Sequence, residues 1–248
     1  MPKKPLLALL TVTLFVIPFG TADSAETENI SPWKAHAEFS YVNTSGNSDN
    51  QTLAGKLEIK REEEQNRIII KGSTLYAKDN DQEKANKWIL DGRVEKNLFN
   101  KIFGFLNASY LRDKLSGYDY RAAIGPGIAY DLLKNDEHYL KSSASILYNY
   151  DRFSLGAEES DKYVSSKTEF NYQWQIRENL KLKQNLDYSI SFEDTEKYFI
   201  NYETAIEVKI TSVISLGLTY TINYQNKLPE AGIKKTDKTF LTSLIIDF

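Results

Sequence analysis

The sequence contains no cysteine, one methionine and two histidines among its 248 residues. The lack of cysteine excludes a disulfide framework, a thiolate metal site, a cysteine nucleophile and a lipid-modified N-terminal cysteine. The 31 basic and 34 acidic residues nearly balance, with a formal net charge of -3, so no basic excess indicates a nucleic-acid partner. We therefore expect no nucleic-acid binding, no cofactor and no metal site.

Only one long apolar run occurs, from Leu6 to Phe19, and two lysines precede it. Small residues follow it, as a signal peptidase requires, so residues 1–22 are predicted to be a cleaved secretory signal, with Ala25 as the alternative end. A retained membrane anchor is the competing interpretation, but the run is shorter than the ~20 residues of a spanning helix. We expect an exported protein with a short periplasmic leader over residues 23–32.

From residue 33 onward, apolar and polar side chains alternate in segments separated by turn-forming residues. In the first segment Trp33, Phe39 and Tyr41 fall on one face, while His36 and Glu38 fall on the other. A period of two is typical of a β-strand with one apolar face. About twelve such segments of roughly 10–13 residues follow one another, and a strand of that length can cross a bilayer at a tilt.

The connections between these segments differ in kind. The tight ones are residues 99–101, 177–179 and 211–213, and the longer, charged ones are residues 78–86, 151–162 and 226–236. Aromatic residues of the apolar faces also gather near the segment ends, with aliphatic residues between them. Short turns at one end, longer loops at the other and two aromatic girdles are typical of membrane barrels. We predict an all-β fold, a transmembrane antiparallel up-and-down β-barrel of about 12 strands over residues 33–248.

The last segment resembles the C-terminal insertion signal of outer-membrane barrels. Its alternate apolar residues, counted toward the C-terminus, are Phe240, Leu244, Ile246 and Phe248. The alternative is a plain edge strand of a soluble sheet. The resemblance implies recognition by the barrel-assembly machinery during biogenesis. We accordingly expect a monomer in the outer membrane of a Gram-negative bacterium, surrounded by membrane lipid and lipopolysaccharide.

Ionisable residues fill the polar faces of the segments. The predicted lumen-lining charge network consists of His36, Glu38, Lys56, Glu58, Asp91, Arg93, Glu95, Arg121, Asp131, Lys167, Glu169, Lys183, Asp187 and Glu203. The lumen of a barrel of about twelve strands is modest, so these charges must pair across it or line a narrow wet channel. A closed, salt-bridged interior and a narrow pore for small solutes both fit this pattern. Mixed charges favour weak ion selectivity.

A lipid hydrolase is the enzymatic alternative, and it would need a nucleophile activated by a base. The sequence has no Gly-x-Ser-x-Gly motif. His36 lies beside Glu38 on a polar face, which favours a histidine in a polar network, and His138 is expected to be a solvated loop residue. We therefore predict no catalytic residue. Acidic clusters in the outer loops leave surface binding as a third possibility.

Two stretches of strand and turn residues resemble a known family. Trp33 leads into Thr44-Ser-Gly-Asn-Ser48, and Tyr110-Leu-Arg-Asp113 is followed by Gly125-Pro-Gly127 and Tyr130. These motifs resemble the DUF481 family, whose members are often labelled salt-induced outer membrane proteins. The resemblance implies a single outer-membrane barrel connected with osmotic or salt stress in the envelope, with no established activity to transfer.

Overall fold

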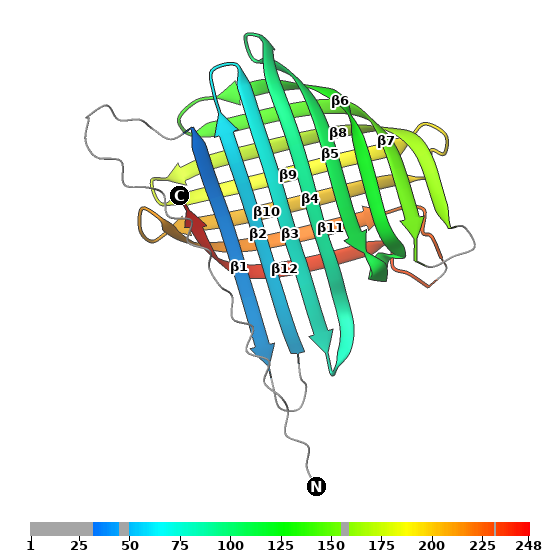
Figure 1. Ribbon diagram of the computed structural model, residues 1–248. Helices are drawn as coiled ribbons and strands as arrows, with labels where there is room; N and C mark the ends of the chain where they lie inside the picture. The colour runs from blue at the N-terminus through cyan, green and yellow to red at the C-terminus, as the bar shows by residue number, and fades with distance from the viewer. Residues whose placement is uncertain (1–31, 45–49, 155–158, 231) are drawn as a thin grey trace, which may run out of the picture. The chain divides into compact units, whose positions relative to one another are not determined.

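The computed structural model describes residues 32–44, 50–154, 159–230 and 232–248, and the predicted signal peptide lies outside them. Twelve strands follow one another around a single closed barrel, each antiparallel to its neighbours (Figure 1). Their bounds are β1 (Trp33–Thr44), β2 (Asn50–Glu62), β3 (Asn66–Asp79), β4 (Gln82–Phe99), β5 (Ile102–Asp113), β6 (Tyr118–Lys134), β7 (His138–Phe153), β8 (Ser160–Arg177), β9 (Leu180–Ser191), β10 (Tyr198–Lys209), β11 (Ile214–Gln225) and β12 (Thr236–Asp247), with a 3₁₀ turn η1 (Lys114–Ser116). The predicted barrel of about 12 strands is confirmed.

The barrel has two different ends. One end carries the short turns together with the start of β1 and the finish of β12, and we call it the turn end. The other end carries the connections after β1, β3, β5, β7, β9 and β11, and we call it the loop end. The tight connection predicted at residues 99–101 is confirmed, because β4 ends at Phe99 and β5 begins at Ile102.

The long, charged connection predicted at residues 78–86 is wrong. Strands β3 and β4 continue to a two-residue turn at Asn80 and Asp81, whose φ angles are 47° and 62°. Positive φ at both central residues is the type I′ geometry that favours asparagine and aspartate. The residues beyond the apolar belt carry polar side chains on both faces, so alternation could not reveal that the strands continue. For the same reason β4 and β8 reach 18 residues, longer than predicted.

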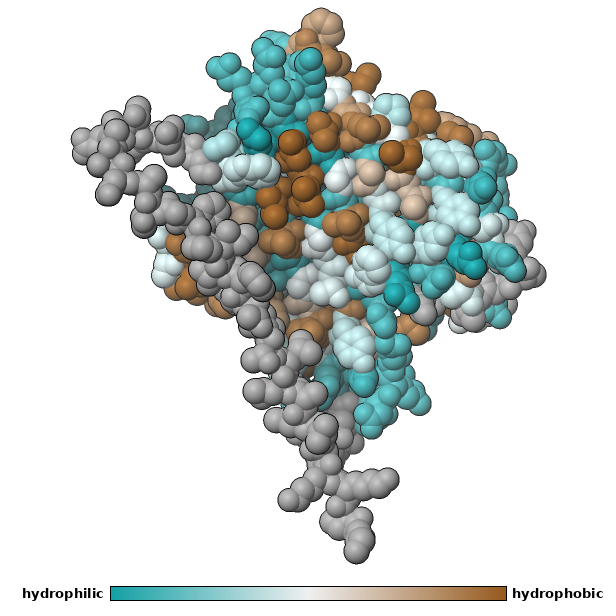
Figure 2. Space-filling view, viewed as in Figure 1, coloured by the Kyte–Doolittle hydropathy of each residue, from teal (hydrophilic) through white to brown (hydrophobic). Residues whose placement is uncertain are grey.

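The outer surface of the barrel is apolar. Large exposed side chains include Phe39, Leu90, Val94, Leu106, Ile124, Ile128, Ile146, Leu216 and Leu244. Figure 2 shows apolar side chains gathered over the outer face of the near wall. Aromatic rings contact one another from strand to strand toward the loop end, with centroid distances of 5.1 Å for Trp88–Tyr110 and 5.5 Å for Tyr110–Tyr120. This belt of aliphatic side chains with an aromatic border is the surface that a bilayer requires.

The interior reverses the pattern of a soluble protein. Glu95, Asp151 and Ser40 are at most 1% exposed, and buried apolar residues gather in a small cluster of Phe103, Phe105 and Ala129. Polar side chains inside and apolar side chains outside are expected where lipid surrounds the protein. The barrel is therefore a transmembrane one. In the described part of the chain, no helix is long and apolar enough to cross a membrane.

The seam that closes the barrel is unusually short. β1 is paired with β2 along its whole length, but it is matched with β12 only from His36–Asp247 to Phe39–Leu244. Two backbone hydrogen bonds between Ala35 and Phe248, of 2.8 and 2.9 Å, extend this ladder at the turn end. Beyond Phe39, β1 and β12 separate toward the loop end (Figure 1).

Candidate functional site

The candidate site is the lumen of the barrel. A cavity of about 570 Å³ lies inside and is lined by residues from β2 through β11. The lining runs from Arg67 and Tyr139 near the turn end to Arg121 and Tyr163 near the loop end. Charged, amide and hydroxyl side chains predominate, because alternate residues of each strand point inward and these are the polar ones. The cavity can therefore hold water and small polar solutes.

An inner cluster of Arg67, Glu95, Phe103, Asp131 and Lys141 occupies the turn end of the lumen. The ammonium of Lys141 lies 2.6 Å from both carboxylate oxygens of Glu95, which is 0% exposed. The guanidinium of Arg67 stacks over Phe103 at 4.3 Å and lies 3.7 Å from Glu95. Its other nitrogen is 4.0 Å from Asp131. Paired charges and a ring thus narrow this end.

Gly127 makes room for this packing. A side chain on Gly127 would meet the ring of Phe105 at 2.2 Å, so only glycine allows Phe105 to fold inward there. The guanidinium of Arg93 in turn stacks over Phe105 at 4.2 Å.

The middle of the lumen is lined by ion pairs, both along the wall and across the lumen. Arg93 on β4 donates a hydrogen bond to Glu169 on β8, across the lumen. Lys167 lies 3.0 Å from Glu169 and 3.5 Å from Asp187. The hydroxyl of Ser143 donates to Glu169 at 2.8 Å. The charges therefore neutralise one another along the wall.

A second chain of charges lies beside the seam. Lys56 on β2 reaches Glu203 on β10 at 2.7 Å and lies 4.0 Å from Glu38. The ring of His36 contacts Glu38 through Nε2 at 3.2 Å and Asp247 through Nδ1 at 2.6 Å. Because β2 and β10 are separated by three strands, the Lys56–Glu203 pair ties two walls together on the seam side of the lumen.

Two further ion pairs lie along the walls of the lumen. Lys183 lies 2.5 Å from Glu207, and Lys71 lies 3.0 Å from Glu58. Asp91 also lines the cavity, facing the same space as Lys71.

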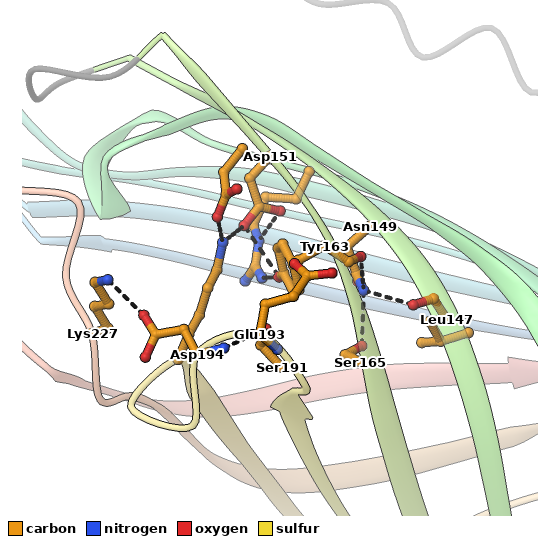
Figure 3. A network of polar contacts seen from close by, with 12 residues as sticks. Leu147, Asn149, Asp151, Tyr163, Ser165, Ser191, Glu193, Asp194 and Lys227 are labelled. Atoms are coloured by element: carbon orange, nitrogen blue, oxygen red, sulfur yellow. Dashed lines mark hydrogen bonds and ion pairs between the residues drawn. The ribbon is translucent and has the colours of Figure 1, made fainter.

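An outer cluster of Arg121, Asp151, Tyr163, Lys197 and Phe199 occupies the loop end. Arg121 donates to Asp151 at 3.0 Å and to the hydroxyl of Tyr163 at 2.9 Å, and it stacks over Phe199 at 3.9 Å. Figure 3 shows Asp151 and Tyr163 directed toward one another from β7 and β8. Lys197, only 6% exposed, places its ammonium 2.8 Å from Asp151. A loop residue therefore completes a buried charge cluster.

The loops above this cluster contact one another. Lys227 in the β11–β12 loop lies 2.6 Å from Asp194 in the β9–β10 loop (Figure 3), and this hydrogen bond holds the pKa of Asp194 below its usual value. Gly117, with φ of 85°, lies so close to Pro229 and Ile233 that a side chain there would meet both within 3 Å. The β11–β12 loop thus reaches the β5–β6 connection on the opposite side of the barrel mouth.

Comparisons with known proteins identify the family. The sequence profile of "Protein of unknown function, DUF481" matches residues 37–248. The chain belongs to the DUF481 family. A curated relative, the "Uncharacterized protein YdiY" of Escherichia coli (strain K12), is 25% identical over 215 residues, which cover 86% of this chain and 82% of the relative. The family thus accounts for nearly all of the described barrel.

Solved structures similar to this DUF481 chain include a porin and an outer membrane channel. The NanC porin has a TM-score of 0.47 at 9% identity, covering 87% of this chain and 97% of its own. The COG4313 outer membrane channel from Pseudomonas putida F1 has a TM-score of 0.46 at 9% identity, covering 87% and 94%. At such identities the likeness concerns the barrel fold alone.

Thirteen of the fourteen residues predicted for the charge network make an ion pair or a hydrogen bond in this DUF481 barrel. They are His36, Glu38, Lys56, Glu58, Arg93, Glu95, Arg121, Asp131, Lys167, Glu169, Lys183, Asp187 and Glu203. Asp91 is the exception among the described residues: it lines the cavity without an ion pair. The predicted insertion residues Phe240, Leu244 and Phe248 are exposed on the barrel surface, and Ile246 is half-buried beside them.

Sequence reasoning missed several members of the clusters. Asp151 was assigned to a loop, although it continues the inward-facing alternation of Asn149 on β7. Lys197 lies between two strands, where no periodicity constrains its direction. His138 is not a solvated loop residue as predicted, since it opens β7 and its ring stacks on Trp174 at 5.7 Å and on Tyr172 at 6.0 Å. In the residues that the structure describes, no group of three or more potential ligands could hold a metal ion.

Proposed function

We propose that this protein is a resident of the bacterial outer membrane, with its turn end in the periplasm and its loops outside. The closed antiparallel barrel, its apolar outer belt and the aromatic border support this proposal. Membership of the DUF481 family agrees with it. Outer-membrane lipid and lipopolysaccharide are the surroundings that such a surface fits, and the exposed C-terminal Phe248 fits an insertion signal.

The function that the geometry supports best is restricted passage of small polar solutes through the lumen. The observation that carries it is the cavity of about 570 Å³, whose polar lining extends between the inner and the outer cluster. The ion pairs neutralise the charges on the walls and leave space between them. Passage is restricted because Lys141 and Lys197 hold the two clusters in place with buried ion pairs.

A planar bilayer experiment tests this proposal. The chain from Asp23 onward is folded, its heat-modifiable migration is checked, and single-channel current is recorded in concentrated salt. Discrete, reproducible steps of small conductance are expected. A silent bilayer with correctly folded protein contradicts the proposal. It favours the second candidate, a closed barrel with a structural or surface-binding role, in which the buried ion pairs of both clusters keep the lumen closed.

The hydrolase alternative receives no support from the histidine near the seam. Both ring nitrogens of His36 contact carboxylates, one of Glu38 and one of Asp247, so neither is placed to activate a hydroxyl. We therefore propose a non-enzymatic role.

The link with osmotic or salt stress follows from the family resemblance, and restricted solute passage suits such a role. It predicts that a strain lacking the protein grows more slowly in high salt than in low salt relative to its parent. Equal relative growth in both media contradicts the link, and leaves the proposal of solute passage untouched.

A further inference from the structure

The separation of β1 and β12 creates a gap in the wall of the barrel. We define the seam gap as residues 40–43 of β1 and 239–243 of β12, the stretches that follow the last matched pair, Phe39–Leu244. Each strand keeps its other neighbour here, since β1 stays paired with β2 and β12 with β11. The gap therefore has two open strand edges that face one another.

Backbone groups of these edges point into the gap. Ala35 and Phe248 exchange both of their backbone hydrogen bonds. In an antiparallel ladder, the N–H and C=O groups of every second residue after such a pair point toward the opposite strand. The next residues to do so beyond Phe39–Leu244 are Tyr41 and Thr242. Their N–H and C=O groups have no strand partner on the gap side. Unpaired backbone groups are very costly in contact with hydrocarbon, so something polar must meet them in a membrane.

The side chains around the gap are uncharged, and small polar residues alternate there with Tyr41, Val42, Phe240 and Leu241. Tyr41 is 58% and Phe240 65% exposed on the outer face. Val42 follows the inward alternation of Ser40, yet it is 49% exposed, and no residue of β12 is matched with it. Residues 40–43 and 239–243 contain no charged side chain. The exposed side chains of Tyr41, Val42 and Phe240 can thus contact a hydrocarbon chain, and the hydroxyl and amide groups between them can meet a polar linkage.

The inner side of the gap is closed where the gap begins. Ser40 is 1% and Ser243 4% exposed, and Ile245 next to them is 1% exposed. The Oγ of Ser40 is buried without a hydrogen-bond partner, at the position where the ladder stops. No residue of β1 or β12 lines the lumen cavity. The gap is therefore a notch that faces the membrane, separate from the solute path.

We propose that the seam gap binds a lipid of the outer leaflet, with one acyl chain against Val42 and Phe240. The carbonyl of its ester or amide linkage accepts a hydrogen bond from an open N–H group of Tyr41 or Thr242, and the N–H of an amide linkage donates to an open C=O group there. Aromatic residues such as Tyr41 and Phe240 prefer the level of the lipid headgroups, where these linkages lie. The site is continuous with the lipid-facing belt and does not depend on whether the lumen conducts.

A strand from a second copy fits the notch less well. An added strand needs a constant spacing of about 4.8 Å from the edge that it joins. The seam gap instead widens from nothing at Phe39–Leu244, the last matched pair of β1 and β12. A flexible acyl chain can fill a wedge of this shape, whereas a strand cannot pair with both edges.

Quenching by brominated lipid tests the proposal. Val42→Cys is labelled with a small fluorophore, which is specific because the chain contains no other cysteine. The full mature protein is folded into phosphatidylcholine vesicles with brominated acyl chains. Leu218→Cys, an exposed residue of β11 outside the gap, is the lipid-facing control, and Thr221→Cys, which lines the cavity, is the lumen-facing control. We expect quenching at Val42 of roughly half or more of that at Leu218, and little at Thr221. Quenching at Val42 as low as at Thr221 overturns the proposal.

A disulfide that closes the gap gives an independent test. Ser40 and Ser243 would form the next pair of the ladder, a non-hydrogen-bonded pair with Cα atoms about 4.5 Å apart, which suits a disulfide. Ser40→Cys/Ser243→Cys is purified from outer membranes in mild detergent and examined by native mass spectrometry. A lipid adduct is expected in the reduced protein and is expected to be lost on oxidation. An adduct that survives closure of the disulfide, or its absence in both forms and in the unsubstituted protein, overturns the proposal.

Discussion

The ammonium of Lys197 lies 2.8 Å from the carboxylate of Asp151, so a residue of the β9–β10 loop is anchored inside the mouth of the barrel. The same ammonium lies 2.8 Å from Asp161 and stacks over Tyr163 at 3.7 Å. The loop therefore narrows the outer end of the solute path with a buried charge, and removing that charge should widen it.

The substitution Lys197→Gln is expected to raise the single-channel conductance, because it releases the β9–β10 loop from Asp151 and Asp161. The increase should be about twofold or more if this constriction limits the current, since a narrow segment dominates the resistance of a pore. Lys227→Gln is the matched control. It breaks an ion pair of the exposed loop surface with Asp194 and should leave the conductance unchanged. Equal conductance of Lys197→Gln and the unsubstituted protein would show that the loop does not limit passage.

The inner cluster predicts an asymmetry in stability. Glu95 has Lys141, Arg67 and Arg93 within 4 Å, so Glu95→Gln leaves three cations without their shared anion. We expect Glu95→Gln to lower the free energy of unfolding by about 3–5 kcal/mol. Lys141→Met should cost about 1–2 kcal/mol, because both arginines still compensate Glu95. Urea unfolding in lipid vesicles, followed by tryptophan fluorescence, measures both values. A larger loss for Lys141→Met contradicts the arrangement.

Asp91 predicts the sign of the ion selectivity. Every other carboxylate that lines the cavity has a cationic side chain within 4.0 Å, whereas Asp91 has none among the described residues. Its negative charge should therefore give the lumen a modest preference for cations. In a salt gradient, Asp91→Asn is expected to move the reversal potential toward the equilibrium potential of the anion. Asp91→Glu, which keeps the charge, should leave it in place. A reversal potential that is the same in all three proteins refutes this role.

The contact between the loops predicts a dependence on pH. The hydrogen bond from Lys227 lowers the pKa of Asp194. The contact between the β9–β10 and β11–β12 loops is therefore fully formed above the ordinary carboxyl pKa of about 3.9. It is lost as the pH falls through the lower pKa of the folded state. Proteolysis of the β11–β12 loop by pepsin should therefore accelerate toward the acid end of its working range, beyond the change in the enzyme's own rate. In Asp194→Asn this extra acceleration should be absent, and its persistence there would assign the effect to another group.

Alternation was enough to predict the number of strands, because lipid on one side and a polar lumen on the other impose a period of two. It placed Phe39 and Tyr41 outside, and His36 and Glu38 inside, as observed. Pairing between charges was not predictable in detail. The contact of Lys56 with Glu203 joins residues far apart in the sequence, and it depends on the tilt of the walls, which no local pattern encodes.

Features at the loop end escaped prediction for a different reason. Outside the membrane both faces of a strand are wet, so the extension of β3 and β4 to Asn80 and Asp81 has no apolar signature. Lys197 has neighbours in the sequence that are polar or exposed, and its burial depends on Asp151 and Asp161 from other strands. The early separation of β1 from β12 likewise depends on closing the whole barrel, although both strands alternate regularly.

Chemical blocking of the lumen tests the central claim most directly. Ser109 lines the cavity and is the cross-strand partner of Asp91 on the adjacent strand. Because the chain has no cysteine of its own, Ser109→Cys is a unique reactive site in the proposed path. A bulky, water-soluble thiol reagent is added while single-channel current is recorded. We expect an irreversible stepwise fall in the current of Ser109→Cys, with no effect on the unsubstituted protein. Current that persists unchanged after mass spectrometry has verified complete labelling would contradict passage through the lumen.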